Sequence, residues 1–293
     1  MAAAFTIAQE VTLEGTSLFS GVASAITIRP KATAGIEFVI DGVAVPAHVS
    51  HVVLSAMRNS VLARDAADKT SARVATIEHV LAALTGLHIW GATISVRGPE
   101  VPIFEGSAQD FVRGLQSAGL VPLDRELAPI VIGEPLRVQD AQGTSILIEP
   151  RNDDRAEATF VYHLDYGDGA AIAKSSARWS GDADAFAREI APARTYCLES
   201  EANAMVASGL FKHLTARDML VIAENGPGRG APIDNALRFA DEPVRHKLLD
   251  LIGDLALLGR PFVGVVTAQR SGHALSHALC RDVVRIFGAS STT

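Results

Sequence analysis

The chain has 293 residues, 48% of them hydrophobic and 20% charged, and its formal net charge is −7. This length and apolar content allow one large domain or two of ordinary size, each with a packed core, and nothing in the composition indicates disorder. The negative charge argues against a nucleic-acid partner, and no apolar run reaches the roughly 18 residues that a membrane-spanning helix needs.

The cysteine content and the first residues indicate the compartment. Two cysteines, Cys197 and Cys280, are too few for a disulfide framework, so a reducing environment is expected. The first nine residues lack the basic region of a signal peptide. We therefore expect a cytoplasmic protein with no membrane span, and a transient contact with a membrane surface stays open.

In chain order, the first 126 residues alternate between strand and helix signals. Runs with strand character lie at residues 5–7, 25–30 and 36–40, with glycine turn signals between them. A helix is expected at 77–86, a strand at 92–96 and a second helix at 108–117. Thr76 and Ser107 stand at the starts of these helices and are suitable N-cap residues.

After residue 126 the same kinds of signal start again. Strands are expected at 130–132, 136–138, 145–148 and 158–162, followed by a helix at 183–190. A long helix begins after Glu242, a strand covers 262–266, and a last helix covers 276–287. Residues 197–232, with a helix at 202–210 and a strand at 220–222, interrupt this order as an insert. An insert beside a site often shapes substrate entry.

The two halves of the chain share a pattern of residue spacing and element order. His79 lies seven residues before Gly86, and His246 lies seven residues before Gly253. In both halves a leucine-rich helix leads through glycine into a strand. This pattern favours a weak internal duplication of an α+β unit, with a boundary at 123–129, although two unrelated amphipathic helices could share it by chance.

The helix after Glu242 carries the strongest functional signal. Its buried side is expected to consist of leucines and Ile252, while His246, Asp250 and Asp254 stand at positions i, i+4 and i+8, one helical turn apart. An imidazole and a carboxylate at this spacing can chelate a divalent metal. The alternative is that the three residues form an ordinary solvated helix face.

Two further segments favour the metal hypothesis. Glu78 and His79 fall in the first turn of the helix expected at 77–86, which places them at the mouth of a site. His273 follows the strand at 262–266 and a short turn. If the duplication is real, Glu78, His79, His246 and Asp250 meet at the interface of two domains, a common location for a site.

Eight short segments together resemble the family of UDP-3-O-acyl-N-acetylglucosamine deacetylases, the zinc amidases of the lipid A pathway in Gram-negative bacteria. The segments occur in the family order, span most of the chain and are highly specific in combination. They are residues 76–79, 98–103, 106–108, 193–195, 237–239, 245–247, 250–254 and 271–275.

This resemblance implies a fold and a metal. The fold is α+β, with two similar sheet-plus-helix sandwich domains in tandem, each with a small insert, and the active site at their interface. The domains are expected at residues 1–126 and 127–293, the second with the insert at 197–232. The resemblance implies Zn²⁺ held by His79, His246 and Asp250, although Fe²⁺ would also suit these donors.

The resemblance also implies catalytic roles. Glu78 is the general base, His273 is the protonated residue opposite it, and Asp254 orients and charges His273. Thr195 helps to hold the oxyanion, and Lys247 contacts the substrate near the metal. Amide hydrolysis requires these functions, because water must lose a proton, the leaving amine must gain one, and the tetrahedral oxyanion needs a donor.

The implied substrate is an acylated nucleotide sugar, bound by a monomer. Asp165 and Tyr166 fall where the family contacts the nucleoside, and Arg270 suits a pyrophosphate. Leu18 and Tyr196 complete the predicted substrate contacts. The alternatives are a core aromatic for Tyr166 and a solvated arginine for Arg270.

The chain departs from the family pattern in places that include no predicted metal ligand or proton-transfer residue. These departures leave open a deacetylase of a different acylated amino sugar and a non-catalytic paralogue on the same scaffold. They are Phe19 for a histidine, Trp90-Gly91 for Asp-Asn, Glu105 for aspartate, Tyr196-Cys197 for Phe-Gly, and residues 211–215 for a glycine-rich segment.

A metalloprotease has little support. The one histidine pair at i, i+4 that begins a helix is His273 and His277. Ala274 stands where the glutamate of that protease motif belongs.

Overall fold

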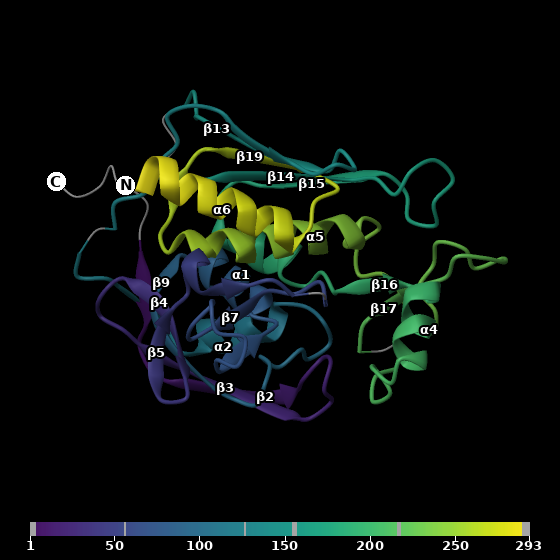
Figure 1. The fold of residues 1–293 in the computed structure, drawn as a ribbon, viewed down its shortest axis with the longest axis horizontal. Helices are drawn as coiled ribbons and strands as arrows, with labels where there is room; N and C mark the ends of the chain where they lie inside the picture. The colour runs from purple at the N-terminus through teal and green to yellow at the C-terminus, as the bar shows by residue number, and fades with distance from the viewer. Residues whose placement is uncertain (1–3, 56, 126, 154–156, 216–217, 289–293) are drawn as a thin grey trace.

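The computed structural model describes residues 4–55, 57–125, 127–153, 157–215 and 218–288. Two sheets form the outer layers of the molecule, and the principal helices lie between them (Figure 1). Each sheet therefore has one face packed on helices, as a sheet with one apolar face requires. Among the described residues, no helix is both long and apolar enough to cross a membrane.

The first half contains a seven-stranded sheet, two helices and a small antiparallel sheet inserted between β5 and α1. Its elements are β1 (Phe5–Ile7), β2 (Val11–Thr16), β3 (Ala23–Pro30), β4 (Gly35–Ile40), β5 (Val43–Pro46), the short helix η1 (Val49–His51), the inserted β6 (Val52–Val53), β7 (Val61–Ala63) and β8 (Arg73–Ala75), then α1 (Glu78–Gly86), β9 (Ile89–Arg97), α2 (Gln109–Ser117) and β10 (Leu120–Pro122).

The second half contains a five-stranded sheet with its helices and a βαβ insert between η2 and α5. Its elements are β11 (Ile130–Val131), β12 (Leu136–Gln139), β13 (Ser145–Glu149), β14 (Thr159–Leu164), β15 (Ser175–Trp179), α3 (Ala183–Ala185), the π-helical turn η2 (Phe186–Ile190), the inserted β16 (Tyr196–Leu198), α4 (Glu199–Ala207) and β17 (Leu220–Ile222), then α5 (Glu242–Leu255), η3 (Ala256–Leu258), β18 (Phe262–Val263), β19 (Val265–Gln269) and α6 (His273–Phe287).

The strand pairings repeat the same unit twice. The path β2-β3-β9-β4-β5 has antiparallel, antiparallel, parallel and antiparallel neighbours. The path β12-β13-β19-β14-β15 has the same four relations in the same order. Each unit also has its insert and then its central helix before the middle strand, β9 or β19. The predicted α+β fold of two similar units is confirmed. The exact boundary at 126/127 stays a prediction, since residue 126 lies outside the described residues.

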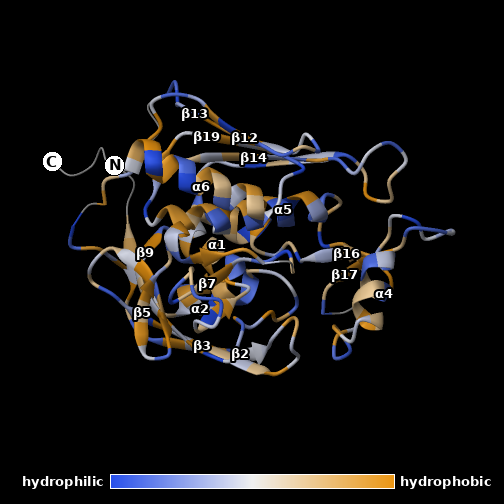
Figure 2. Ribbon diagram, viewed as in Figure 1, coloured by the Kyte–Doolittle hydropathy of each residue, from blue (hydrophilic) through white to orange (hydrophobic). Residues whose placement is uncertain are grey.

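The centre of the molecule is the contact between α1 and α5, one helix from each half. Every residue of α1 is buried, and the helix is coloured as largely hydrophobic in the middle of the molecule in Figure 2. A Cβ added at Gly253 of α5 would stand 2.0 Å from the carbonyl oxygen of Glu78. Glycine at this position therefore lets the two helix backbones touch.

Two local predictions about helix starts are wrong. Thr76 does not cap α1, because it has a left-handed backbone (φ +59°) and its hydroxyl accepts a hydrogen bond from Asn59. The long helix runs through Gly253 to Leu255, as the predicted helical positions of Asp254 and Leu255 require, and η3 follows before the left-handed Gly259. The last helix begins at His273, three residues earlier than predicted.

Other boundaries shift for identifiable reasons. The hydroxyl of Ser107 accepts a hydrogen bond from the N–H of Gln109, as an N-terminal cap does, although the helix starts one residue later than predicted. The helix expected at 202–210 lies at Glu199–Ala207. The edge strands β2, β5 and β15 were not predicted, and they bury few residues.

Candidate active site

Three side chains from α1 and α5 converge on one point. His79 comes from the first turn of α1, and His246 and Asp250 come from successive turns of α5. Their ligand atoms all lie within 4.8 Å of one another. Oδ1 of Asp250 is 3.6 Å from Nε2 of His79 and 3.4 Å from Nε2 of His246. The packing of the two helices thus assembles what neither helix holds alone.

This donor set fits a divalent metal ion. Nδ1 of His246 lies 3.0 Å from the carbonyl oxygen of Ala193 and donates to it, so Nε2 keeps its lone pair. Burial lowers the pKa of His246 to about 4, and the neutral imidazole is the metal-binding form. Burial opposes ionisation of Asp250, but His246 and Lys247 hold its pKa well below the usual range. Two neutral imidazoles with one carboxylate are typical ligands of a catalytic metal.

Glu78 lies beside the three candidate ligands. Its carboxylate is buried, and Oε2 accepts a hydrogen bond of 3.0 Å from the N–H of Ser60. Burial raises the pKa of Glu78 against the opposing charge of His273. A carboxylate with a raised pKa is a better acceptor for a proton near neutral pH.

His273 and Asp254 form a buried ion pair on the other side of the site. Nδ1 of His273 is 2.9 Å from Oδ2 and 3.0 Å from Oδ1 of Asp254. Burial by itself would lower the pKa of His273, but the charge and hydrogen bond of Asp254 raise it to about 9. Nε2 of His273 is 4.0 Å from Oδ2 of Asp250, so the imidazolium faces the candidate metal site.

Lys247 contacts the candidate ligand Asp250 directly. Its Nζ donates a hydrogen bond of 2.6 Å to Oδ2 of Asp250. Burial acts to lower the pKa of Lys247, but Asp250 outweighs it and raises the pKa, so the ammonium stays charged. Because Lys247 also lines the cavities on both sides of the site, its charge is available to a ligand there.

Thr195 is positioned by a buried ion pair between its chain neighbour Arg194 and Glu242 at the start of α5. Arg194 and Glu242 are 6% and 0% exposed, and two nitrogens of the guanidinium contact the carboxylate at 2.8 and 3.1 Å. Glu242 also accepts from the backbone N–H groups of Arg194 and Arg238. This network ties the segment that carries Thr195 and the carbonyl of Ala193 to the start of α5.

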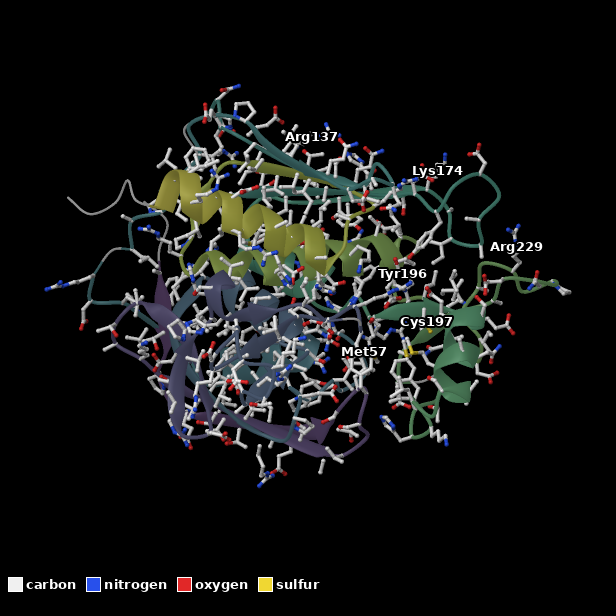
Figure 3. All side chains as sticks on the ribbon, in the orientation of Figure 1. Met57, Arg137, Lys174, Tyr196, Cys197 and Arg229 are labelled. Carbon is white, nitrogen blue, oxygen red and sulfur yellow. The ribbon has the colours of Figure 1, made fainter. Side chains whose placement is uncertain are left out.

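Two cavities open on the site. The first, of about 290 Å³, lies between the second insert and the first half and contains the three candidate ligands, Glu78 and Thr195. Its far wall is an apolar cluster of Leu18, Ile103, Cys197, Phe211 and Met219. Figure 3 shows Tyr196, Cys197 and Met57 gathered where the insert faces the rest of the molecule.

The second cavity, of about 640 Å³, extends from His273 along the second half. Asp165 and Arg270 line it, together with Thr144 and Arg58. The side chain of Asp165 pairs with Lys174 at 3.3 Å, and Arg270 donates to the carbonyl oxygen of Gln142. Both cavities have mixed linings. We call this one the polar cavity after its charged residues Arg58, Asp165 and Arg270, and the first the apolar cavity after its far wall.

The structure divides the five predicted substrate residues between the two cavities. Leu18 and Tyr196 line the apolar cavity, and Asp165 and Arg270 line the polar one. Tyr166 lines both, and its hydroxyl is 3.0 Å from that of Tyr196. Tyr166 is 46% exposed, so the alternative that it is a core aromatic is wrong.

Three residues near the site were not singled out from the sequence. Ser60 contacts Glu78 and Asp254. Glu100 is buried and accepts from the backbone N–H groups of Phe19 and Ser20, which holds the loop that carries Leu18. Glu100 and Arg194 lie in the segments 98–103 and 193–195, which were among those that resemble the family, so the sequence pointed to their neighbourhood. No sequence pattern pointed to Ser60.

Comparison with known proteins gives one consistent result. Residues 4–285 match the family described as UDP-3-O-acyl N-acetylglycosamine deacetylase. Proteins named UDP-3-O-acyl-N-acetylglucosamine deacetylase from Anaeromyxobacter dehalogenans and Thermosynechococcus vestitus are 38% and 34% identical to the chain. These alignments cover 95% and 96% of the chain, and 86% and 93% of the respective relatives. A relative of the same name from Leptospira biflexa is 32% identical over 95% of the chain.

Proposed function

Because the chain belongs to the UDP-3-O-acyl N-acetylglycosamine deacetylase family, we propose that it hydrolyses the N-acetyl amide of UDP-3-O-acyl-N-acetylglucosamine and releases acetate, as a step of lipid A biosynthesis. The observation that carries the proposal is the convergence of His79, His246 and Asp250 between Glu78 and His273. A metal-dependent amidase combines a metal-binding centre with a base and an acid on either side, and this geometry supports that arrangement.

The proposal includes a metal, for which Zn²⁺ is the first choice and Fe²⁺ the second. His79, His246 and Asp250 would hold it. When bound, the metal supplies Lewis acidity, which makes water nucleophilic at neutral pH and polarises the amide carbonyl.

The protein side chains handle the protons. Glu78 accepts a proton from the attacking water, for which its raised pKa suits it. His273, kept cationic by Asp254, donates a proton to the nitrogen of the leaving amine as the C–N bond breaks. One water is consumed, and acetate and the free amine are the products.

Two further side chains act on the reacting carbonyl and the substrate. Thr195 lines the cavity beside Glu78, where its hydroxyl can donate to the developing oxyanion. Lys247 contributes a fixed positive charge beside Asp250 and between the two cavities.

The two cavities suit the two parts of the substrate. We assign the nucleotide to the polar cavity, where Arg270 suits a pyrophosphate and Asp165 and Tyr166 suit a nucleoside. The acyl chain then occupies the apolar cavity lined by Leu18 and Tyr196. The Tyr166–Tyr196 hydroxyl pair lies at the junction between the two.

A second candidate function keeps the chemistry and changes the acylated amino sugar. It is favoured by one observation: Phe19 and Phe211, two of the departures from the family pattern, stack at 5.6 Å in the wall of the apolar cavity. The cavity that receives the acyl chain is therefore the part of the site that differs from the family pattern.

The experiment is an acetate-release assay on the purified, zinc-loaded protein. UDP-3-O-acyl-N-acetylglucosamine should be deacetylated, and simple N-acetyl sugars tested in parallel should not. Glu78→Gln and His79→Ala should each lower kcat/KM about 10²-fold or more. Absence of acetate from the acylated nucleotide sugar would rule out this substrate, and full activity of Glu78→Gln would rule out the mechanism.

The proposal also covers the location, oligomeric state and domain boundary of the protein. We propose a cytoplasmic monomer built from domains 1–126 and 127–293. Sedimentation at micromolar concentration tests the monomer, and cell fractionation tests the location. Separate expression of the two fragments tests the boundary, since each should fold but neither should bind the metal alone.

A further inference from the structure

Ser60 contacts Glu78 through its backbone and the His273–Asp254 pair through its side chain. It is fully buried and directly precedes β7, in the insert of the first half. Its N–H donates to Oε2 of Glu78 at 3.0 Å, and its carbonyl oxygen accepts from the N–H of Ile77 at 3.4 Å. Both contacts hold the first turn of α1, from which Glu78 and His79 project.

The side chain of Ser60 reaches the other half of the molecule. Its Oγ is 2.6 Å from Oδ1 of Asp254 and 2.8 Å from Nε2 of His277. Asp254, buried between its histidine partners, lies on α5, and His277 lies one turn after His273 on α6. One serine thus links the base on α1 to the acid pair on α5 and α6.

The number of hydrogen atoms fixes the direction of these bonds. A serine hydroxyl has one proton to donate, and an ionised carboxylate can only accept. The 2.6 Å distance to Asp254 is in the range of a charge-assisted O–H···O⁻ bond, so the Ser60 proton belongs there. His277 must then donate its Nε2–H to Oγ of Ser60, because Oγ has no second proton to offer.

We propose that Ser60 is a positioning residue of the hydrolase, which holds Glu78 and the His273–Asp254 pair at a fixed separation, and that His277 turns the Ser60 hydroxyl toward Asp254. The inference rests on the proposed deacetylase function. Ser60 lines neither of the two cavities described above, so it acts through its neighbours and has no contact of its own with the substrate. These neighbours are Glu78, Asp254 and His273, whose Nδ1 is 3.4 Å from Oγ of Ser60.

The fold explains why a serine before β7 can do this. β7 pairs with β8, and β8 leads within three residues to Glu78. Asn59 strengthens the same connection by donating to Oγ1 of Thr76 at 3.1 Å. The inserted hairpin therefore fixes Ser60 against the start of α1, and α5 and α6 close over its hydroxyl.

The first test is a kinetic comparison of Ser60→Ala with the parent enzyme. The variant keeps the backbone N–H to Glu78 and loses the bond to Asp254. We expect kcat to fall about 10- to 100-fold with KM and metal content unchanged, and Ser60→Thr, which retains the hydroxyl, to recover most of it. Ser145→Ala, which removes another buried and hydrogen-bonded hydroxyl, is the matched control and should keep full activity.

A double-mutant comparison then asks whether Ser60 acts through Asp254. In an Asp254→Ala background, Ser60→Ala should cause no further loss of kcat. The proposal is overturned if Ser60→Ala lowers kcat by the same factor in the Asp254→Ala background as in the parent. It is also overturned if the effect of Ser60→Ala comes from a raised KM or a lowered metal content. Activity of Ser60→Ala within about twofold of the parent also overturns it. The parent assay reports separately on the proposed function, since acetate release by the parent does not depend on Ser60.

A second measurement reads the hydrogen-bond direction in the parent protein, and a variant is used only to assign the signals. ¹⁵N–¹H correlation spectra of the histidine-labelled, metal-loaded enzyme report which ring nitrogen of His277 carries hydrogen, with His277→Gln to assign its signals. A proton on Nε2 is the expected result. A His277 with hydrogen on Nδ1 alone would mean that Ser60 donates to His277, and the proposal would be wrong.

Discussion

At the scale of single residues, the site holds two histidines in opposite charge states. Burial lowers the pKa of His246 to about 4, whereas the carboxylate of Asp254 raises that of His273 to about 9. A neutral imidazole binds a metal and a cationic one donates a proton, so the local surroundings assign the two roles. The side chains of His246 and His273 are 3% and 10% exposed, and each faces a carboxylate. Burial prevails at His246, whereas the hydrogen-bonded ion pair with Asp254 prevails at His273.

The pair of His273 and Asp254 predicts a pH dependence. Asp254 stabilises the cationic form of His273, so Asp254→Asn should lower the pKa of His273, by about 1–3 units for a charge at this distance. The active form is protonated, and activity is lost as pH rises through that pKa. The alkaline limb of kcat/KM, measured from pH 6 to 10, should therefore move to lower pH. An alkaline limb that stays in place in Asp254→Asn would show that another group sets it.

Removal of the metal ligands predicts loss of the metal itself. His79→Ala and His246→Ala should each contain well under one metal per chain by elemental analysis, because each leaves only two of the three donors. His163→Ala, a change at an exposed histidine of β14, should keep the parent metal content. Chelation should abolish acetate release by the parent and added Zn²⁺ should restore it. Full metal occupancy in both ligand variants would contradict the assignment.

At the scale of elements, the contact of α1 with α5 sets the geometry of the proposed metal site. His79 is on one helix and His246 and Asp250 on the other, so any change in helix separation changes the distances between donors. Gly253 permits the close approach, since a Cβ there would overlap the carbonyl oxygen of Glu78.

Gly253→Ala should damage both stability and activity. The added methyl group must push the helices apart, which should lower the free energy of unfolding by about 1–3 kcal/mol and reduce kcat. Gly228→Ala is the control, because nothing lies within 4 Å of its Cβ position. Urea unfolding and acetate release measure the two effects. Parent-like stability and turnover in Gly253→Ala would mean that the helices do not meet as closely as described.

The buried Arg194–Glu242 pair gives a second prediction at this scale. Arg194→Ala leaves the fully buried carboxylate of Glu242 without its partner, which should lower the free energy of unfolding by about 3–5 kcal/mol. The double variant with Glu242→Ala should be less destabilised than the sum of the single changes, since no uncompensated charge remains. Arg285→Ala, at an exposed ion pair, should change stability by less than about 1 kcal/mol. Additive losses in the double variant would argue against a coupled pair.

At the scale of the whole molecule, two copies of one unit face each other, and each contributes different residues to the proposed active site. The first half supplies Glu78 and His79, and the second supplies the other ligands and the acid pair. The inserts differ more than the sheets do, since one is an antiparallel sheet and the other a βαβ unit. The cavities open beside these inserts, so we expect substrate specificity to be set where the two halves are least alike.

The apolar cavity predicts a limit on the acyl chain. Phe211 stacks on Phe19 in its wall and fills space that a chain could occupy. Phe211→Ala should raise kcat/KM for longer acyl chains relative to shorter ones, measured in competition between substrates that differ only in chain length. Met205→Ala, on α4 in the same cavity, gives a comparison for general loosening of the insert. An unchanged chain-length preference in Phe211→Ala would place the acyl chain elsewhere.

Much of this protein could be predicted from its sequence, because the deciding signals are local. The spacing of His246, Asp250 and Asp254 on one helix follows from 3.6 residues per turn, and the burial of the neighbouring leucines is confirmed. The repeated order of strand and helix signals predicted two similar units, and the strand pairings confirm them. The roles assigned to the site residues stay predictions until the variants are measured.

Other features were decided only by the tertiary structure, because they depend on contacts between segments far apart in the chain. Ser60 lies 194 residues from Asp254 in the chain, and no local sequence pattern predicts the hydrogen bond between them. Gly253 lies inside α5 as the sequence predicted, but only the packing shows that the backbone of α1 occupies the space of a side chain there. The sequence by itself determined which groups could bind a metal and move protons. Packing of the two halves decided their distances, charges and partners, since burial and proximity arise only when the helices meet.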